Sequence, residues 1–594
     1  MKQKILLILI LMVASFLRFN NLMWGDGHFF HPDENNMARS VAQMTFENGL
    51  HPDFFAYGQL PLYLAFFSAL IANYIQLFFH YLLNSYSELQ VTSYKLQDVT
   101  FQEAIFFLRF WSAITSVISV YLVYRITRTI ASEKYALLAA LLTAFTPGLI
   151  QAAHFGTTES LLTYFFLLIL FFCIKIVQSK SVYASSSRLF VLLGIAFGLS
   201  LGIKLTSVYF FVPIGMTMLL YLTRIRAQKQ RFALLHRLLL FLLVVVSTSL
   251  GYSISSPHNL ISYKEFSDSM RYEINVAQGL DVFYTRQFEG ATPFLFQITH
   301  IFPYALGWAL FVIGTICLLY ALFKGVRDLF HLHTANRTQT LILIILLVSF
   351  FSFLIFNSIL YVKWTRFLTP LFPIFSIFVA ITAGSIVPSL TQYVEKNYKS
   401  YQFLYQSILI VIIMYSLVPG IRFNTIYARK DTRVQASEWI YENIPQGSYI
   451  LSETANVVDI PVGKIPASPA GRRNYTVISF NFYELDHPSL RNTRYEELLI
   501  HLEKADYIFV PSRRIFANHM RFPEKYPVIN AYYEALFDGR LGFKQVHTEE
   551  PMLNDESAEE TWTVFDHPTI RIYNKTTPKT RNEYGKILNQ SISL

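Results

Sequence analysis

The sequence predicts a mostly α-helical, multi-pass membrane protein of about eleven spans, with a small external α/β domain at its C-terminal end. Hydrophobic residues make up 53% of the 594 residues and charged residues only 15%, which is more apolar surface than one soluble core could bury. Apolar stretches of about 17 to 25 residues, long enough to span a bilayer, recur as far as residue 420. The net charge of +10 does not indicate nucleic-acid binding, because the basic residues fall in short clusters between these stretches.

Eleven apolar segments are the predicted spans. The first follows Lys2 and Lys4 and lacks a small-x-small cleavage site, so we expect an uncleaved helix rather than a signal peptide. The two cysteines, Cys173 and Cys317, lie inside apolar segments, so no disulfide is expected. The spans are residues 4–23, 104–125, 135–153, 160–177, 188–203, 205–222, 235–255, 301–323, 338–360, 367–388 and 402–420.

A further apolar segment, residues 60–83, is expected to be an interfacial helix within a first external loop, residues 24–103. If this segment crossed the membrane, the basic loop around Arg125 and Lys134 would lie outside, against the positive-inside rule. With eleven spans, the N-terminus is cytoplasmic and the C-terminal segment is external. We therefore expect a plasma-membrane protein whose active site and C-terminal domain face outward.

Residues 1–420 are predicted to form the transmembrane domain, and residues 421–594 a soluble α/β domain. The tail loses the long apolar stretches and alternates patterns typical of helices and strands. The predicted elements are a helix capped by Asp431 and ending near Tyr441, a strand at 448–452, a helix at 493–504, and strands at 507–511 and 570–573.

Ionisable residues at the outer ends of the spans are the candidates for an active site. Charged groups near hydrocarbon are costly and often mark functional sites. Carboxylates there can act as general bases, and Lys and Arg can bind phosphate without a metal. The candidates are Asp33 and Glu34 in the first loop, His154 and Glu159 between the third and fourth spans, Lys204 between the fifth and sixth, and Lys363 and Arg366 between the ninth and tenth.

Each candidate also has a purely structural interpretation. The adjacent acids at 33–34 could form a solvated turn, and Glu159 suits the first turn of any helix. Lys363 and Arg366 could be interfacial side chains whose stems lie in the membrane. Lys204 is harder to explain in this way, because it interrupts an apolar stretch at an outer tip.

The spacing of His28, His31, Asp33 and Glu34 could hold a metal ion, but no HExxH, paired CxxC or Asp-rich loop supports a metal site. Neither a GxxxxGK[ST] phosphate loop nor a GxSxG elbow is present. We therefore expect no cofactor, with a divalent metal as the less favoured alternative.

Several motifs occur in order along the first 420 residues. They are His31-Pro-Asp-Glu34, Tyr57-Gly-Gln-Leu-Pro-Leu-Tyr63, Arg109-Phe-Trp-Ser-Ala113, His154 to Thr163 with Glu159, Gly198 to Thr206 with Lys204, and Lys363 to Pro373 with Arg366. This order resembles the GT-C membrane glycosyltransferases that use polyprenyl-phosphate sugars, related to protein O-mannosyltransferases and bacterial lipid A aminoarabinose transferases. The sequence departs from the family at Glu159, where Asp is the commoner acid.

The resemblance implies an inverting transfer of a sugar from a polyprenyl-phosphate donor to a hydroxyl of a protein, glycan or lipid acceptor at the outer membrane surface. Asp33 would be the general base, and Glu34 and Glu159 would orient the reacting groups. The departing lipid phosphate would be stabilised by cationic side chains. The residues implied in substrate or phosphate binding are His31, Arg109, His154, Lys204, Lys363 and Arg366.

Two other functions stay open from the sequence. The first is a metal-dependent, oligosaccharyltransferase-like enzyme that uses the 28–34 cluster and Glu159 around a cation. The second is a lipid or sugar transporter, which would place ionisable residues near mid-bilayer and repeat its two halves.

Overall fold

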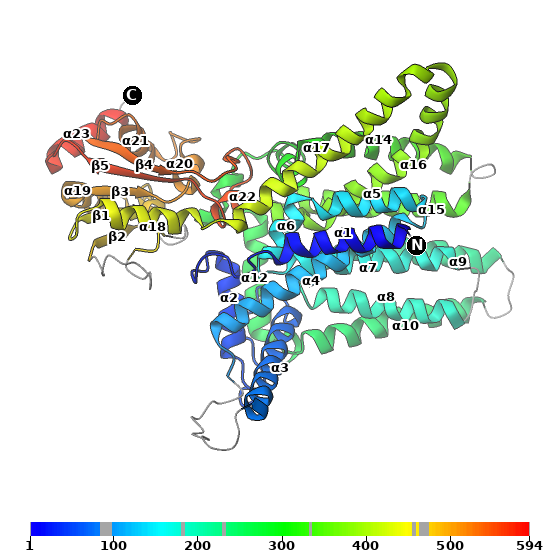
Figure 1. The fold of residues 1–594 in the computed structure, drawn as a ribbon. Coiled ribbons are helices and arrows are strands. Elements are labelled where there is room, and N and C mark those ends of the chain that lie inside the picture. Colours follow the sequence, from blue (N-terminus) through cyan, green and yellow to red (C-terminus); the bar gives the residue numbers. More distant parts are fainter. Residues whose placement is uncertain are drawn as a thin grey trace. The chain divides into compact units, whose positions relative to one another are not determined.

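The computed structural model describes residues 2–83, 98–179, 184–227, 233–331, 336–453, 459–462 and 474–592. The chain forms two compact units. The first comprises Met1–Leu22, Asp33–Gln278 and Pro293–Asn424, and the second comprises Met23–Pro32, Gly279–Thr292 and Thr425–Leu594. Long apolar helices fill the first unit, and a five-stranded sheet lies in the second, which confirms the predicted fold class (Figure 1). Residues 84–97 of the predicted first loop lie outside the described residues.

The regular elements in the described part of the first unit are all helices. Its elements are α1 (Lys2–Phe19), α2 (Pro32–Gln43), α3 (Leu60–Leu83), α4 (Phe101–Thr127), α5 (Glu133–Ala144), α6 (Pro147–His154), α7 (Glu159–Gln178), α8 (Ala184–Leu201), η1 (Leu205–Phe210), α9 (Phe211–Ala227), α10 (Ala233–Ser255), α11 (His258–Ile261), α12 (Tyr263–Gln278), η3 (Gln297–Ile301), α13 (Phe302–Leu306), α14 (Trp308–Phe330), α15 (Arg337–Ser358), η4 (Thr365–Leu371), α16 (Phe372–Asn397), η5 (Lys399–Tyr401) and α17 (Gln402–Ala428), whose last turn enters the second unit.

Within the described residues, nine helices are long and apolar enough to cross a membrane, or ten if the bent pair α5–α6 is one span. This confirms a multi-pass membrane protein. With α5–α6 counted as one span, the described part of the structure gives ten candidate spans against the eleven predicted, and three helices account for the difference. Helix α1 carries three charges in 18 residues, the apolar part of α8 is only Ser187–Leu201, and α3 qualifies through Leu60–Phe79. All eleven predicted segments coincide with helices.

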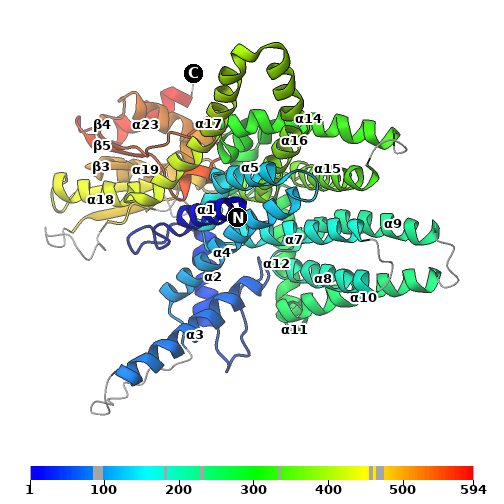
Figure 2. The ribbon, with the colours of Figure 1, turned by 45° about the vertical axis from the view of Figure 1, so that its right-hand side comes forward.

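Helix α3 runs in a different direction from the helices of the bundle. Figures 1 and 2 show α8 and α10 side by side, with α3 inclined steeply to both. A third of its apolar window is buried. Helix α3 therefore does not share the direction of α8 and α10.

The predicted span at 135–153 is not one straight helix. Helices α5 and α6 meet at an angle of 55°. Pro147 opens α6, and its ring and missing N–H are incompatible with a continuous helix through this point. The bend brings the end of α6 to the turn that precedes α7.

A buried arginine joins three helices of the first unit. The Arg18 guanidinium donates to the Ser116 hydroxyl at 2.7 Å and to the carbonyl oxygens of Ala144 at 3.0 Å and Thr143 at 3.3 Å. A buried charge is tolerated only where such acceptors surround it. Arg18 therefore fixes α1 against α4 and the end of α5.

Helices α8 and α10 approach each other closely through small residues. A Cβ atom on Gly198 would lie 2.2 Å from the carbonyl oxygen of Thr248. Gly194 and Gly202, one turn away on either side, have similarly close neighbours in Ser247 and Ser255. This small-residue spacing is typical of tightly packed membrane helices. It positions the end of α8, where Lys204 follows.

The second unit is built around a sheet of strand order β2-β1-β3-β5-β4. The central β1 pairs in parallel with β2 and β3, while β5 is antiparallel to β3 and β4. The strands are β1 (Tyr449–Glu453), β2 (Thr476–Phe480), β3 (Tyr507–Val510), β4 (Phe543–Glu549) and β5 (Ile570–Lys575).

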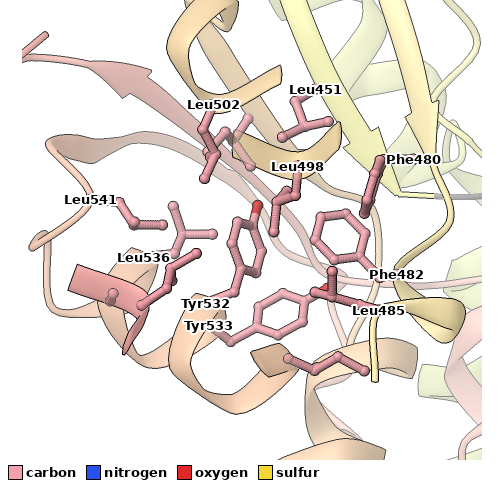
Figure 3. Packing of buried hydrophobic residues seen from close by; sticks show 14 of the residues in the cluster. Leu451, Phe480, Phe482, Leu485, Leu498, Leu502, Tyr532, Tyr533, Leu536 and Leu541 are labelled. Carbon is pink, nitrogen blue, oxygen red and sulfur yellow. The ribbon is translucent and has the colours of Figure 1, made fainter. Parts of the chain in front are cut away.

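Helices cover both faces of this sheet. One face packs against α19, α21 and α23, and Figure 3 shows Tyr532 and Tyr533 of α21 among Leu451 and Leu498. The other face packs against α18, which Asp431 caps as predicted. The helical elements of this unit are η2 (Phe283–Phe288), α18 (Thr432–Asn443), η6 (Phe482–Glu484), α19 (Arg491–Lys504), α20 (Arg514–His519), α21 (Pro527–Phe537), α22 (Thr561–Val564) and α23 (Arg581–Ile592).

Candidate active site

Asp33 lies in the first turn of α2 and contacts two residues that are distant in sequence. The Tyr57 hydroxyl donates to its Oδ2 at 3.0 Å, and the Arg366 guanidinium forms an ion pair with the same oxygen. The side chain of Asp33 is 25% exposed. This carboxylate is therefore held in place while remaining accessible.

Arg366 is carried by the short helix η4, which follows the loop after α15. Its guanidinium carbon lies 4.9 Å from the ring centre of Trp364 and 5.9 Å from that of Phe367. Aromatic faces stabilise a cation and restrict its side chain. The aromatic residues beside Arg366 thus limit its movement to the space near Asp33.

Lys204 and Glu159 form a second acid–base pair beside the first. Lys204 precedes η1, Glu159 opens α7, and the Lys204 Nζ lies 3.4 Å from Glu159 Oε1. The same Nζ lies 4.9 Å from the ring centre of Tyr57 and 4.7 Å from that of Phe367. Tyr57 therefore contacts Lys204 with its ring and Asp33 with its hydroxyl.

A pocket of about 280 Å³ of unfilled space, partly open to solvent, lies beside the two pairs. Arg366 of the first pair and both members of the second line it, and Asp33 does not. Glu159, Lys204 and Arg366 supply its charged wall. Asn357 and Ser207 are further polar groups, and the remaining wall is mostly apolar, with three phenylalanines. A pocket with a cationic end and an apolar side suits an amphiphilic phosphate. The lining residues are Glu159, Leu162, Lys204, Thr206, Ser207, Phe210, Phe353, Asn357, Arg366, Phe367 and Pro370.

The segment that carries Tyr57 is fixed by its neighbours Gly58 and Gln59. Gly58 donates to the Ile203 carbonyl at 2.9 Å, and a Cβ atom on it would lie 2.2 Å from the Gly202 carbonyl oxygen. The buried Gln59 amide donates to Asn259 at 2.9 Å and accepts from the His258 backbone at 3.0 Å. The first loop is thereby tied to the turn before Lys204.

Glu34 is enclosed, unlike its neighbour Asp33. It is fully buried and receives two 2.7 Å hydrogen bonds from Arg109, through Nε and Nη2, and one of 2.6 Å from the Gly156 N–H. Arg109 also donates to the Leu22 carbonyl at 2.9 Å. This two-pronged pair joins α2, α4 and the turn before α7, and it leaves both groups away from the pocket wall.

His154 ends α6 and is also fully buried. Its Nδ1 lies 2.8 Å from the Ile150 carbonyl oxygen and its Nε2 lies 3.0 Å from that of Asn20. These contacts fix the ring between α6 and the end of α1. In this structure, His154 holds α6 against the end of α1.

Lys363 precedes η4 and donates to the carbonyl oxygens of Leu360 at 2.8 Å and Tyr361 at 3.0 Å. Burial lowers the pKa of its ammonium group. The side chain therefore closes its own loop and does not line the pocket.

His31 belongs to the second unit, although it precedes Asp33 by only two residues. Its ring centre lies 4.5 Å from that of Phe565, and the side chain is buried. His31 thus lies in the second unit, Asp33 contacts Tyr57 and Arg366, and Glu34 is enclosed with Arg109, so these three predicted residues do not form one group.

Several residues around the pocket were not among the predicted candidates. Tyr57 and Phe367 lie in the motifs at 57–63 and 363–373, and Asn357 lies in an apolar segment without a distinguishing pattern. Glu273, on the amphipathic helix α12, is a fourth: burial raises the pKa of its carboxyl, and Lys204 opposes this shift. The polar face of α12, which lies between the predicted spans 235–255 and 301–323, was the sequence signal that could have indicated Glu273.

One group in the described part of the chain has the composition of a metal site. The ligand atoms of His51, Asp53 and Glu265 all lie within 4.8 Å of one another. The His51 Nδ1 lies 2.8 Å from Asp53, and its Nε2 lies 3.5 Å from Glu265. Because the two ring nitrogens face different carboxylates, the geometry fits a bridge between the first loop and α12 better than shared ligation of one ion.

Comparison with solved structures shows the same architecture elsewhere. The archaeal oligosaccharyltransferase AglB from Archaeoglobus fulgidus, solved with an inhibitory peptide and a dolichol-phosphate, aligns with a TM-score of 0.52 and 13% identity over 89% of this chain and 72% of AglB. The chain has the GT-C fold. This confirms the resemblance inferred from the motifs.

Other GT-C structures and one family model also match. ArnT from Cupriavidus metallidurans, in the apo state, aligns with a TM-score of 0.43 and 14% identity over 84% of this chain and 91% of ArnT. The Pmt1-Pmt2 complex of S. cerevisiae, bound to its sugar donor, aligns with a TM-score of 0.34 and 14% identity over 45% of this chain and 34% of its own. The model for dolichyl-phosphate-mannose-protein mannosyltransferases matches residues 96–252, a range that contains Glu159 and Lys204. No curated protein matches the sequence.

Proposed function

We propose that this GT-C protein transfers a sugar from a polyprenyl-phosphate donor to an acceptor hydroxyl at the outer surface of the membrane. The observation that carries the proposal is the convergence of Asp33, Arg366 and Lys204 around Tyr57. One carboxylate and two cations come from three separate segments: Asp33 contacts Tyr57 and Arg366, Lys204 contacts the ring of Tyr57, and the two cations line one pocket. The structure of AglB with a dolichol-phosphate supports this class of substrate.

In the proposed reaction, the acceptor oxygen attacks the anomeric carbon of the sugar while Asp33 takes its proton. The new bond joins that oxygen to the anomeric carbon, and the bond between this carbon and the phosphate oxygen breaks. The lipid phosphate leaves with the electron pair. Its charge is stabilised by Lys204 and Arg366, which supply fixed positive groups where negative charge develops. Attack opposite the leaving group inverts the anomeric configuration.

The ion pair between Arg366 and Asp33 gives substrate binding a further role. A phosphate held near Lys204 would compete with Asp33 for the Arg366 guanidinium, since both are anions within its reach. Moving Arg366 toward the phosphate frees the carboxylate to accept a proton. In this scheme, donor binding and activation of the base are coupled.

The other predicted residues take positioning roles in this proposal. Glu34 and Arg109 fix α2 to α4, and Glu159 orients Lys204. Lys363 and His154 shape their own loops, and His31 packs in the second unit. We therefore propose Asp33, Lys204 and Arg366 as the residues that touch the reacting groups.

A second candidate function is a metal-dependent transferase of the oligosaccharyltransferase type. Its support is the composition of the His51, Asp53 and Glu265 group, whose ligand atoms lie within 4.8 Å of one another, although the positions of the His51 ring nitrogens fit a bridge better. In this alternative the ion would act on the same donor class, and chelation would abolish transfer.

The test measures transfer of radiolabelled sugar from polyprenyl-phosphate donors to endogenous membrane acceptors. The full chain is reconstituted in liposomes that contain these acceptors, and a panel of donors is tried. We expect transfer that persists in EDTA and falls by about a hundredfold or more in Asp33→Asn, as for loss of a general base. The matched control is Asp268→Asn, an exposed acid on α12, which should transfer like wild type.

Each arm has a contrary outcome. Equal transfer by Asp33→Asn would exclude Asp33 as the base, and loss of transfer in EDTA would select the metal-dependent alternative. If folded wild-type protein consumes none of the donors, the transferase function itself is wrong and transport becomes the leading interpretation.

A further inference from the structure

The second unit contains a pocket that the proposed reaction does not use. It is an open pocket with about 450 Å³ of unfilled space, part of it continuous with solvent, where α17 ends and α18 begins. Thr425 and Ile426 come from the last turn of α17, and Glu550 and Met552 from the segment after β4. Asp566 and His567, which precede β5, complete the wall.

Most charges in this wall are already paired. Asp431 binds Arg433 through both carboxylate oxygens, at 2.8 and 2.7 Å. Asp566 accepts from the Tyr427 hydroxyl at 2.7 Å and lies 2.5 Å from the His567 Nδ1. These contacts make the floor of the pocket rigid and nearly neutral.

Other wall charges have partners outside the pocket. Lys430 pairs with Glu438 at 2.5 Å, and Glu549 lies 3.2 Å from His547. Arg429 and Glu550 differ, since no hydrogen bond or ion pair with another described residue involves either of them. They come from different segments and carry opposite charges. The pocket therefore presents one unpaired cation and one unpaired anion on a preformed floor.

The position of α17 places this pocket near the membrane surface. The apolar span Lys399–Ala428 has 30 residues, about 45 Å at 1.5 Å per residue, against about 30 Å for the hydrocarbon core of a bilayer. A helix of this length that stands close to the bilayer normal extends into the headgroup layer. Arg422, near its end, is exposed and is a residue type found at the ends of membrane helices.

We propose that this pocket binds the zwitterionic headgroup of a membrane phospholipid. The phosphate lies beside Arg429 and the ammonium group beside Glu550. Ile426 and Met552 offer apolar contact to the glycerol and the first methylenes. A headgroup with both charges satisfies both unpaired side chains, whereas an anionic headgroup would place its phosphate near Glu550 with no ammonium to offset the repulsion.

The test uses native mass spectrometry of the full chain in detergent, with added phosphatidylethanolamine or phosphatidylglycerol of identical acyl chains. We expect retention of phosphatidylethanolamine over phosphatidylglycerol in wild type. Arg429→Gln and Glu550→Gln should each reduce this preference by about fivefold, as for loss of one exposed charge pair. Exposed charges elsewhere in the unit, tested as Lys544→Gln and Glu524→Gln, are the matched controls and should leave it unchanged.

A second arm adds soluble phosphoethanolamine, which separates a lipid site from a site for a free zwitterion. The proposal is supported if phosphoethanolamine displaces the lipid only when its concentration is far above that of the lipid. The lipid should bind more tightly because its acyl chains add apolar contact. Binding of phosphoethanolamine without any preference for the lipid would overturn it. Equal retention of both lipids by wild type, or an unchanged preference in both variants, would also overturn it. None of these outcomes depends on glycosyl transfer.

Discussion

Neighbouring acids in one helical turn have opposite surroundings in this protein. Successive residues of an α-helix point about 100° apart, so Glu34 faces Arg109 on α4 while Asp33 faces Tyr57 and Arg366. Removing one partner of a buried pair such as Glu34 and Arg109 costs about 3–5 kcal/mol. The enclosed acid therefore secures the position from which the accessible one can act.

Tyr57→Phe tests how Asp33 is controlled at the level of one hydroxyl. The variant loses the hydrogen bond to Asp33 and keeps the ring beside Lys204. We expect the transfer rate to fall by about tenfold or more, since a hydrogen bond to a charged group is worth about 1.5–3 kcal/mol. The acidic limb of the pH–rate profile should move to higher pH, because the lost bond favoured the ionised carboxylate.

The matched control for this prediction is Tyr63→Phe, in the same segment. The Tyr63 hydroxyl makes only long contacts of 3.4 Å, with the Leu50 carbonyl and Gln59. Its removal should change neither the rate nor the pH profile. A shifted profile in both variants would show that the segment moves as a whole and that the Tyr57 hydroxyl has no specific role.

At the scale of elements, the contact between α8 and α10 determines where Lys204 lies. Gly198→Val would place side-chain atoms against the Thr248 carbonyl oxygen, which is backbone and cannot rotate away. The helices must separate, and overpacking of this kind costs about 1–3 kcal/mol. We expect a lower thermal unfolding midpoint in detergent and reduced transfer, because Lys204 follows directly from α8.

Gly215→Val is the control for the helix contact. A Cβ atom on Gly215, in α9, would have no neighbour within 4 Å. Replacing glycine there should leave the midpoint unchanged or raise it slightly, since valine restricts the unfolded chain. Equal destabilisation by both substitutions would mean that the close approach of α8 and α10 does not limit stability.

Strand β1 introduces a pH dependence into the second unit. Burial raises the pKa of Glu453, the last residue of β1, from 4.5 to about 8, while the Tyr533 hydroxyl, 2.5 Å from its Oε1, opposes this shift. The folded state thus holds a proton that the unfolded state releases above pH 4.5. The stabilisation is complete below pH 4.5 and is lost as the pH rises through 8.

Hydrogen exchange of the full chain measures this effect locally. After correction for the intrinsic exchange rate, protection of β1 and β3 should fall by about tenfold or more between pH 6 and 9. Glu453→Gln should remove most of this dependence, and Glu442→Gln, on the exposed side of α18, should retain it. A Glu453→Gln profile identical to wild type would contradict the assignment to this carboxyl.

For the whole molecule, composition and periodicity were enough to predict the helices, but they were not enough to predict which residues form the site. All eleven apolar segments became helices, and β1, β3 and β5 lie where apolar stretches predicted them. Strand β2 has a mostly exposed pattern and β4 is interrupted by a bulge, so neither has the alternation that identifies a strand.

For the site, the predicted membrane topology placed the candidate ionisable residues on one side. Which of them are enclosed by partners, as Glu34 and His154 are, depends on contacts between distant segments that no local pattern contains.

The predicted topology can be tested with single cysteines, because both native cysteines are buried. If α3 lies along the outer surface, Glu47→Cys and Asp98→Cys, on either side of α3, will both react with a membrane-impermeant maleimide in intact cells, as will Lys504→Cys in the second unit. Lys134→Cys and Lys396→Cys will react only after permeabilisation, because the basic loops are expected inside.

Reaction at Glu47 and Lys134 but not at Asp98 would show that α3 crosses the membrane. That result would reverse the sidedness of every helix end after α3, and Lys204 and Arg366 would then lie across the bilayer from the part of the first loop that carries Asp33. Because Lys204 contacts the ring of Tyr57 and Arg366 pairs with Asp33, we expect labelling of both ends of α3 from the outer side.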